Sequence, residues 1–287
     1  MTRFYKLSGS GNDFLALAEP WETPSAERIR AWCRRGVSIG ADGLFVLRRA
    51  TDDGTAGATM DYFNADGLAA DLCLNGTRCA AQLAFHLGWA ENTQRTMRLR
   101  TGAGDVEARW LDDGRTAVGL PAPPEPPQPL TVDLDGAAHA GWRILVGVPH
   151  FVLLWPQGLE SAPVRELGAR LRHHPVFGVP GTNVDFVRFP APDRMEIRTW
   201  ERGVEDETLS CGTGCLAGAA VGLDLGIARL PLTVETQGGF ALAVAGDPEA
   251  GSWFLSGDAR VVAEGEILPG AAVLPPPPAW CRETDSK

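Results

Sequence analysis

A proline-rich run near the middle of the chain limits how the polypeptide can fold. Residues 121–129 read Pro-Ala-Pro-Pro-Glu-Pro-Pro-Gln-Pro, and prolines lack the N–H donors that helices and central strands need. We therefore expect an extended connector here. It nearly bisects 287 residues, a length that allows two compact domains. We predict an N-terminal domain over residues 1–120 and a C-terminal domain over residues 130–264, with a strand from residues 265–275 packing back on the first.

Both halves mix helical and strand-like spacing. Residues 25–35 place their apolar side chains on one helical face, and Val106, Ala108 and Trp110 alternate with polar residues as in a strand. After the proline run, residues 163–172 are expected to be helical. Residues 142–155, interrupted by Gly-Val-Pro, and residues 183–189, 195–200 and 253–262 are expected to be strands. Because strands and helices do not alternate strictly, the pattern predicts an α+β protein rather than a doubly wound parallel sheet.

The composition excludes several kinds of partner. The formal net charge is −10, and no basic cluster is present that could neutralise a nucleic-acid backbone. No stretch approaches the roughly 18 apolar residues of a membrane span, and the first residues do not resemble a signal peptide. We therefore expect no nucleic-acid or membrane partner and a cytoplasmic location. The tail, with prolines at 275–278, is expected to be extended and is assigned no chemistry.

Two cysteines stand at the expected starts of two helices, one in each half. Cys73 precedes Leu-Asn-Gly-Thr and Cys211 precedes Gly-Thr-Gly, and an Ala- and Leu-rich segment follows each. The free N–H groups of a helix start favour a thiolate, which predicts a thiol pKa lowered from about 8.5 toward neutrality. They also suit a carboxylate. With such a carboxylate between the two starts, one thiolate could remove the α-proton while the opposite thiol delivers another.

The cysteines also allow plainer interpretations. With six in a chain of this length, a disulfide scaffold is excluded, and a reducing compartment leaves thiols or metal ligands. The cysteines at and inside the two helices could bind zinc, because three residues separate Cys211 from Cys215, although five separate Cys73 from Cys79. A non-catalytic zinc- or ligand-binding protein therefore stays open. Packing as small apolar side chains is the expectation for Cys33, Cys79, Cys215 and Cys281.

The two halves share motifs in the same order, which indicates a loose duplication. Residues 11–14 (Gly-Asn-Asp-Phe) resemble residues 182–186 (Thr-Asn-Val-Asp-Phe), and the segments after the two helix-start cysteines resemble each other. The spacing differs, because Asn12 precedes Cys73 by 61 residues and Asn183 precedes Cys211 by 28. A repeat of fixed period is therefore excluded.

Six motifs together resemble the diaminopimelate epimerase family of cofactor-independent amino-acid epimerases, over nearly the whole chain. The resemblance implies an α+β fold of two pseudo-symmetric domains, each a mixed, largely antiparallel sheet wrapped around a central helix, with the active site between them. It also implies a small amino-acid substrate, no cofactor and no metal, and homodimers occur in the family. The motifs lie, in the family's order, at residues 8–14, 40–43, 63–67 with 73–79, 149–150, 181–186, and 201–203 with 211–214.

The same resemblance implies roles for individual residues. Cys73 and Cys211 become the acid/base pair on opposite faces of the substrate α-carbon, with His150 assisting Cys73 and Glu201 assisting Cys211 as proton acceptors. The substrate-binding residues form two groups. One group offers backbone N–H groups to the α-carboxylate, and the other contacts the far end of the substrate. There a planar arginine guanidinium can donate two hydrogen bonds to a carboxylate. The first group is Leu74, Asn75, Gly212 and Thr213, and the second is Asn12, Asn64, Asn183 and Arg202.

Several positions depart from the family pattern. Leu74 replaces a usual glycine, Val148 replaces a usual asparagine before Pro-His, and the loop of residues 203–208 is one residue longer, with acidic residues at 205–207. These changes bear on the substrate rather than on proton transfer, because both thiols and both proton acceptors are present. The expected reaction converts LL-diaminopimelate to meso-diaminopimelate, on the route to lysine and peptidoglycan.

Two other enzyme types are alternatives to that reaction. The alternative is a racemase of another amino acid such as histidine, whose cationic side chain the acidic loop would suit. A phenazine-pathway isomerase is disfavoured, because such proteins lack the two-cysteine arrangement.

Overall fold

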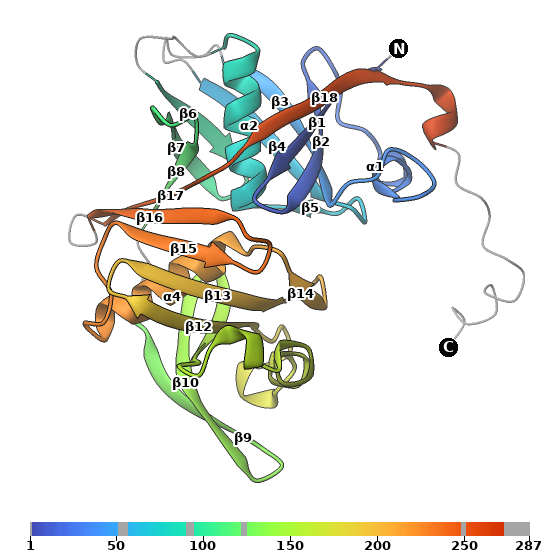
Figure 1. Cartoon of the computed structure of the whole chain (residues 1–287). Helices are drawn as coiled ribbons and strands as arrows, with labels where there is room; N and C mark the ends of the chain where they lie inside the picture. The colour runs from blue at the N-terminus through green and yellow to red at the C-terminus, as the bar shows by residue number, and fades with distance from the viewer. Residues whose placement is uncertain (1, 51–56, 90–94, 122–124, 248–250, 273–287) are drawn as a thin grey trace, which may run out of the picture.

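The chain forms two lobes, each with a sheet wrapped around one long helix (Figure 1). The computed structural model describes residues 2–50, 57–89, 95–121, 125–247 and 251–272. The central helix is α2 (Leu74–His86) in the first lobe and α4 (Gly212–Asp224) in the second, and α1 (Ala26–Cys33) lies outside the first sheet. The predicted α+β class is confirmed. No helix in the described part of the chain is long and apolar enough to cross a membrane.

The first lobe is built on a mixed sheet. Its strands are β1 (Thr2–Gly9), β2 (Asn12–Ala18), β3 (Gly43–Ala50), β4 (Gly57–Asn64), β5 (Ala69–Ala70), β6 (Thr96–Thr101), β7 (Gly104–Trp110), β8 (Thr116–Pro121) and β18 (Arg260–Ile267). They pair in the order β18–β1–β2–β3–β4–β6–β7–β8, and β5 pairs with β4. The β2–β3 and β4–β6 pairs are parallel, and the others are antiparallel.

The second lobe repeats this pairing. Its strands are β9 (Gln128–Leu134), β10 (Ala137–Val146), β11 (Val148–Leu154), β12 (Asn183–Ala191), β13 (Arg194–Glu201), β14 (Asp206–Thr208), β15 (Leu232–Thr236), β16 (Ala241–Asp247) and β17 (Ser252–Gly257). Their order is β9–β10–β11–β12–β13–β15–β16–β17, with β11–β12 and β13–β15 parallel. An antiparallel β8–β17 pair joins the two sheets.

The matching topology corrects how the two halves were aligned from sequence. Strand β3 is equivalent to β12, so Asp42, which directly precedes β3, corresponds to Asn183 at the start of β12. Asp42 precedes Cys73 by 31 residues and Asn183 precedes Cys211 by 28. The predicted match between residues 11–14 and 182–186 was therefore wrong by one strand, which accounts for the unequal spacing.

Glycines allow α4 to lie close to its sheet. A Cβ on Gly218 would lie 2.8 Å from the Met195 sulfur, and one on Gly222 would lie 2.5 Å from the Phe189 ring. Such distances are shorter than non-bonded carbon contacts. The helix is buried along most of its length, so its first residue is held at a fixed depth between the lobes.

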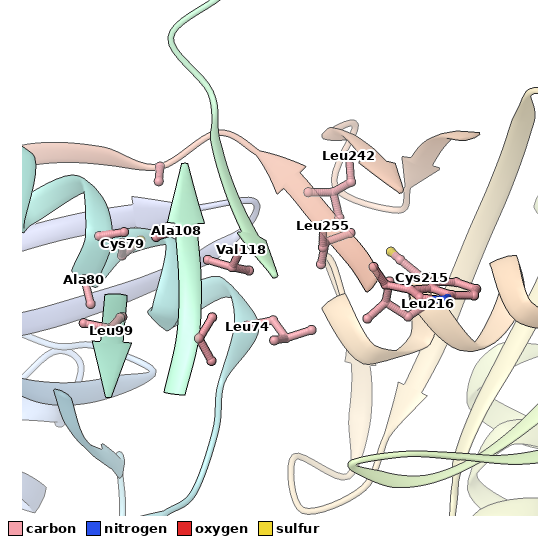
Figure 2. Close-up of a cluster of buried hydrophobic side chains, with 14 of the residues drawn as sticks. Leu74, Cys79, Ala80, Leu99, Ala108, Val118, Cys215, Leu216, Leu242 and Leu255 are labelled. Carbon is pink, nitrogen blue, oxygen red and sulfur yellow. The ribbon is translucent and has the colours of Figure 1, made fainter. Parts of the chain in front are cut away.

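One hydrophobic cluster runs through both lobes. Leu74, at the start of α2, points toward Leu216 of α4 and Leu255 of β17 (Figure 2). A Cβ on Gly212 would lie 2.9 Å from the Leu74 Cβ, so the starts of α2 and α4 are in van der Waals contact. Smaller clusters lie beneath α1 and beside β12.

Several elements differ from their predicted extent. The expected strand at residues 253–262 is two strands, β17 and β18. The expected helix at residues 163–172 is a π-helical turn (Val164–Gly168) followed by α3 (Ala169–Arg172). Short 3-10 turns span Leu159–Ser161, Pro175–Phe177 and Pro269–Ala272. Helix α1, strand β7, and the strands around residues 183–189 and 195–200 confirm their predictions.

The proline run is not only a connector, because its two ends belong to strands. Pro121 ends β8 and Pro129 lies in β9, which pairs only with β10 among the described strands. Edge strands tolerate proline, because the unpaired edge of the strand has no neighbouring strand to which an N–H group must donate.

The chain returns to the first lobe earlier than expected. Strand β18 pairs with β1 from residue 260, not from about 265. Residues 122–124, the prolines at 275–278 and Cys281 lie outside the described residues, and the division into two domains stays a prediction.

Candidate active site

A cavity of about 470 Å³ lies where the starts of α2 and α4 meet between the lobes. It brings together all but one of the site residues predicted from sequence. Those lining it are Asn12, Asn64, Cys73, Leu74, Asn75, Asn183, Glu201, Arg202, Cys211, Gly212 and Thr213. Beyond Cys73 a second space of about 800 Å³ shares Asn12, Asn64, Glu201 and Arg202 with it, so the cleft has room for an extended substrate.

Each cysteine is the N-cap residue of its helix. Cys73 and Cys211 have extended backbones and no capping side-chain bond. Their carbonyls accept the first helical bonds, from Thr77 N–H at 2.7 Å and Cys215 N–H at 3.0 Å. The next N–H groups in each helix have no partner within the helix. Both thiols therefore lie beside donors suited to an anion, as predicted.

Burial changes the acidity of both thiols in the direction opposite to the prediction. It raises the pKa of Cys73 above its ordinary value and that of Cys211 well above it. The helix-start N–H groups of Gly76 and Gly214 lower the two pKa values, but by less than burial raises them. The expected fall toward neutrality is therefore wrong for the substrate-free site, because desolvation outweighs the helix start.

Glu201 acts electrostatically on both thiols. Its carboxylate, at the end of β13, raises the pKa of Cys73 and of Cys211. Burial in turn raises the pKa of Glu201, which brings the carboxyl closer to the range where a general base operates near neutral pH. The sequence linked Glu201 with Cys211 alone, whereas the structure places it within electrostatic reach of both.

Each thiol also has a hydroxyl partner. Thr213 Oγ1 lies 3.4 Å from Cys211 Sγ, and the Tyr62 hydroxyl lies within hydrogen-bonding reach of Cys73, whose pKa it lowers. The Tyr62 ring meets Phe14 edge to face at 6.2 Å. The sequence analysis missed Tyr62, although β4 alternation places it on the same strand face as Asn64.

Replacing Tyr62 by phenylalanine is expected to raise the pKa of the Cys73 thiol, because its thiolate loses a hydrogen-bond donor. At a fixed neutral pH, alkylation of Cys73 by iodoacetamide should slow by about fivefold, the worth of one ordinary hydrogen bond. Peptide mass mapping would follow Cys73 and Cys211 separately. Tyr5→Phe, at the only other tyrosine, is the matched control, and equal alkylation rates in both variants would contradict the assignment.

The Asn75 amide links the two lobes at the cavity, and the Arg78 guanidinium holds that amide from within the first lobe. Asn75 Nδ2 donates to Asn12 Oδ1 at 2.7 Å and to the Ser210 carbonyl of the second lobe at 3.4 Å. Fully buried Arg78 donates to Asn75 Oδ1 at 2.7 Å and to Ser10 Oγ at 2.9 Å. These bonds fix the orientation of the Asn75 amide at the cavity wall.

His150 does not line this cavity. Its side chain is buried, with Nδ1 2.7 Å from Asp185 Oδ2 and Nε2 3.3 Å from Asn183 Nδ2. Asn183 reaches the cavity wall, where its Oδ1 accepts from the Arg202 N–H at 2.7 Å. The predicted assistance of Cys73 by His150 therefore stays a prediction, with both ring nitrogens in contact with other residues.

The acidic loop at residues 205–207 is paired internally. Glu205 accepts from buried Arg172 at 2.8 Å, and Arg198 holds Glu207 through two bonds of 2.6 and 2.9 Å. All these residues belong to the second lobe. The loop therefore does not offer free carboxylates to a cationic substrate, which removes the sequence argument for histidine.

The remaining positions bear on zinc and on specificity. Cys79 and Cys215 are fully buried within their helices, as expected for packing residues. Among the described residues, no group of three or more His, Cys, Asp or Glu side chains could hold a metal ion. Val148 lines the cavity beside Val146 and Gly147, so the departure from the family's asparagine lies at the site itself.

Comparison with protein families finds one match across both lobes. The family model described as diaminopimelate epimerase matches residues 4–122 and 143–262. The diaminopimelate epimerase of Aquifex aeolicus is 36% identical over 275 residues, covering 92% of this chain and 97% of that protein. The diaminopimelate epimerase of Chlorobaculum tepidum is 35% identical over 264 residues, covering 91% and 99%.

Solved structures share the fold at low sequence identity. A phenazine biosynthesis protein from Enterococcus faecalis superposes with a TM-score of 0.67 at 15% identity, covering 93% of this chain and 99% of that one. A hydroxyproline epimerase from Agrobacterium vitis gives a TM-score of 0.64 at 15% identity, covering 92% and 91%. At these identities the likeness shows the two-lobed fold alone.

Proposed function

The chain belongs to the diaminopimelate epimerase family, and we propose that it inverts one α-carbon of diaminopimelate by moving protons between Cys73 and Cys211. It is an isomerase by that membership. The observation that carries the two-thiol mechanism is the shared cavity, in which two N-cap cysteines from opposite lobes lie beside free helix-start N–H groups.

The proposed reaction needs one thiolate and one thiol. The N–H groups of Leu74, Asn75, Gly212 and Thr213 hold the α-carboxylate and stabilise the negative charge that develops next to it. One thiolate takes the α-proton and leaves the bonding electrons on carbon. The opposite thiol then donates its proton to the other face, so the centre is inverted and the thiol and thiolate exchange places. Glu201, near both sulfurs, accepts and returns protons between turnovers.

Specificity for the far end of the substrate rests on the second group of predicted residues. Arg202 can donate two parallel hydrogen bonds to a distal carboxylate, and the amides of Asn12, Asn64 and Asn183 line the same cleft. Diaminopimelate is favoured over histidine by the family match, and the paired carboxylates of Glu205 and Glu207 leave no separate argument for histidine. The cytoplasmic location and the homodimer stay predictions.

Incubation in deuterium oxide would test substrate and reaction together. With LL-diaminopimelate, we expect the α-proton NMR signal to disappear while the meso form accumulates, because each inversion delivers a solvent-derived deuteron. L-histidine and other amino acids serve as parallel substrates. Exchange confined to another amino acid would refute the substrate, and no exchange by reduced, folded protein would refute the catalytic proposal.

Treatment with hydroxylamine and a chelator would test cofactor dependence. Unchanged epimerisation rates are expected from cofactor-independent chemistry, whereas loss of activity would favour a carbonyl or metal cofactor.

A further inference from the structure

A continuous line of buried polar groups lies behind the wall of the cavity. Asp185 on β12 is fully buried and stands opposite Thr199 on β13. Thr199 Oγ1 donates to Asp185 Oδ1 at 2.7 Å, and His150 Nδ1 lies 2.7 Å from Asp185 Oδ2. The line continues through Asn183 to the backbone of Arg202. It therefore joins the buried carboxylate to two residues of the cavity wall.

The direction of the bonds between Arg202 and Asp185 follows from the Arg202 end of the line. A backbone N–H can only donate, so the Arg202 N–H, 2.7 Å from Asn183 Oδ1, fixes that atom as the amide oxygen. The Asn183 NH₂ group then faces His150 Nε2 at 3.3 Å, and Nε2 must accept. The ring proton is consequently on Nδ1, where it donates to Asp185 Oδ2. The geometry thus selects the neutral Nδ1–H tautomer of His150.

The Asp185 carboxylate lies against the first turn of α4, in the space beside Gly214. A Cβ on Gly214 would lie 2.5 Å from Asp185 Oδ1 and 3.2 Å from Thr199 Oγ1. Only glycine at this position leaves room for the carboxylate in its present place. The positive end of a helix also favours a negative charge there. The carboxylate is therefore held by two hydrogen bonds and by the same helix that carries Cys211.

We propose that Asp185 is a positioning residue, which holds His150 as the Nδ1–H tautomer and thereby orients the Asn183 amide and the Arg202 backbone toward the cavity. In this arrangement His150 Nε2 accepts from the Asn183 amide. The histidine acts through Asn183 on the end of the cleft that receives the far end of the substrate. This last step rests on the proposed function, whereas the tautomer does not.

Nitrogen-15 NMR of histidine-labelled protein would test the tautomer without any substrate. Long-range proton–nitrogen correlations distinguish protonated from unprotonated ring nitrogens, and a His150→Gln variant identifies the signals of His150 among five histidines. We expect a protonated Nδ1 and an unprotonated Nε2 in the unaltered protein. A protonated Nε2 would overturn the proposal, and this measurement needs no variant of Asp185 to fold.

The Asp185→Asn variant tests the positioning role. Its amide NH₂ can face His150 Nδ1, so we expect the Nε2–H tautomer to appear, and KM for LL-diaminopimelate to rise about tenfold with a smaller change in kcat. Asp193→Asn, at the exposed turn of the same β12–β13 hairpin, is the matched control and should alter neither. A tautomer and a KM both unchanged in Asp185→Asn would refute the role. If the unaltered protein epimerises nothing, the proposed function fails while the tautomer result still stands on its own.

Discussion

Replacing either Cys73 or Cys211 by alanine is expected to lower epimerisation of both isomers by more than about 10³-fold, the scale of losing a general acid or base. Inversion needs a proton removed from one face of the α-carbon and another delivered to the opposite face. A single remaining thiol serves one face only. Such a variant should therefore still exchange the α-proton of one isomer with deuterium oxide, with retention of configuration, and the two variants should differ in which isomer they exchange.

The two helices carry their own matched controls for this experiment. Cys79 and Cys215 follow the N-cap cysteines within α2 and α4, and both are fully buried. Their alanine variants remove a sulfur from the same helices without touching the cavity, so epimerisation should persist in folded protein. A Cys73→Ala or Cys211→Ala variant that inverts either isomer at a normal rate would be incompatible with the two-thiol mechanism.

Much of this site was legible in sequence because it is built from local motifs. An N-cap cysteine followed by Asn-Gly-Thr or Gly-Thr-Gly and an apolar helix places a thiol at a helix start wherever the helix lies, and the structure confirms both starts. The glycine spacing of α4 similarly reflects close packing on β12 and β13. What the resemblance added was that the two starts face one another, which no short segment encodes.

The parts that sequence reasoning missed depend on tertiary contacts. Burial, which raises the pKa of both thiols, is set by how the two lobes pack against each other and not by the residues next to the cysteines. Asp185 was visible only as one letter of a motif, because its partners Thr199 and His150 come from other strands. The acidic loop was expected to suit a cationic substrate, but Glu205 pairs with Arg172, which lies more than thirty residues away in the sequence.

Leu74 shows how a departure from the family pattern can be structural. Its side chain is 4% exposed and packs on Gly212 and Leu255 between the lobes, while its backbone N–H remains at the cavity. Replacing it by glycine, the residue usual in the family, is expected to lower the free energy of unfolding by about 3 kcal/mol, because the substitution leaves an interlobe cavity. Urea titrations would measure this loss, and Leu68→Gly at an exposed leucine should cost much less.

The contact between Leu74 and Gly212 predicts that their substitutions are not additive. A Cβ at residue 212 would lie 2.9 Å from the Leu74 Cβ and 3.1 Å from Leu255 Cδ2, so Gly212→Ala alone should destabilise the protein by about 1–3 kcal/mol through overpacking. In a Leu74→Gly background the nearest of these atoms is absent. The alanine should then cost at least about 1 kcal/mol less, a coupling typical of touching residues. Strict additivity in the double-mutant cycle would show that the two helix starts do not pack as the structure has them. The coupling also explains how a chain with leucine at position 74 keeps its two N-cap cysteines on facing helix starts. The leucine side chain fills the space between the lobes, and Gly212 on the facing helix leaves room for it.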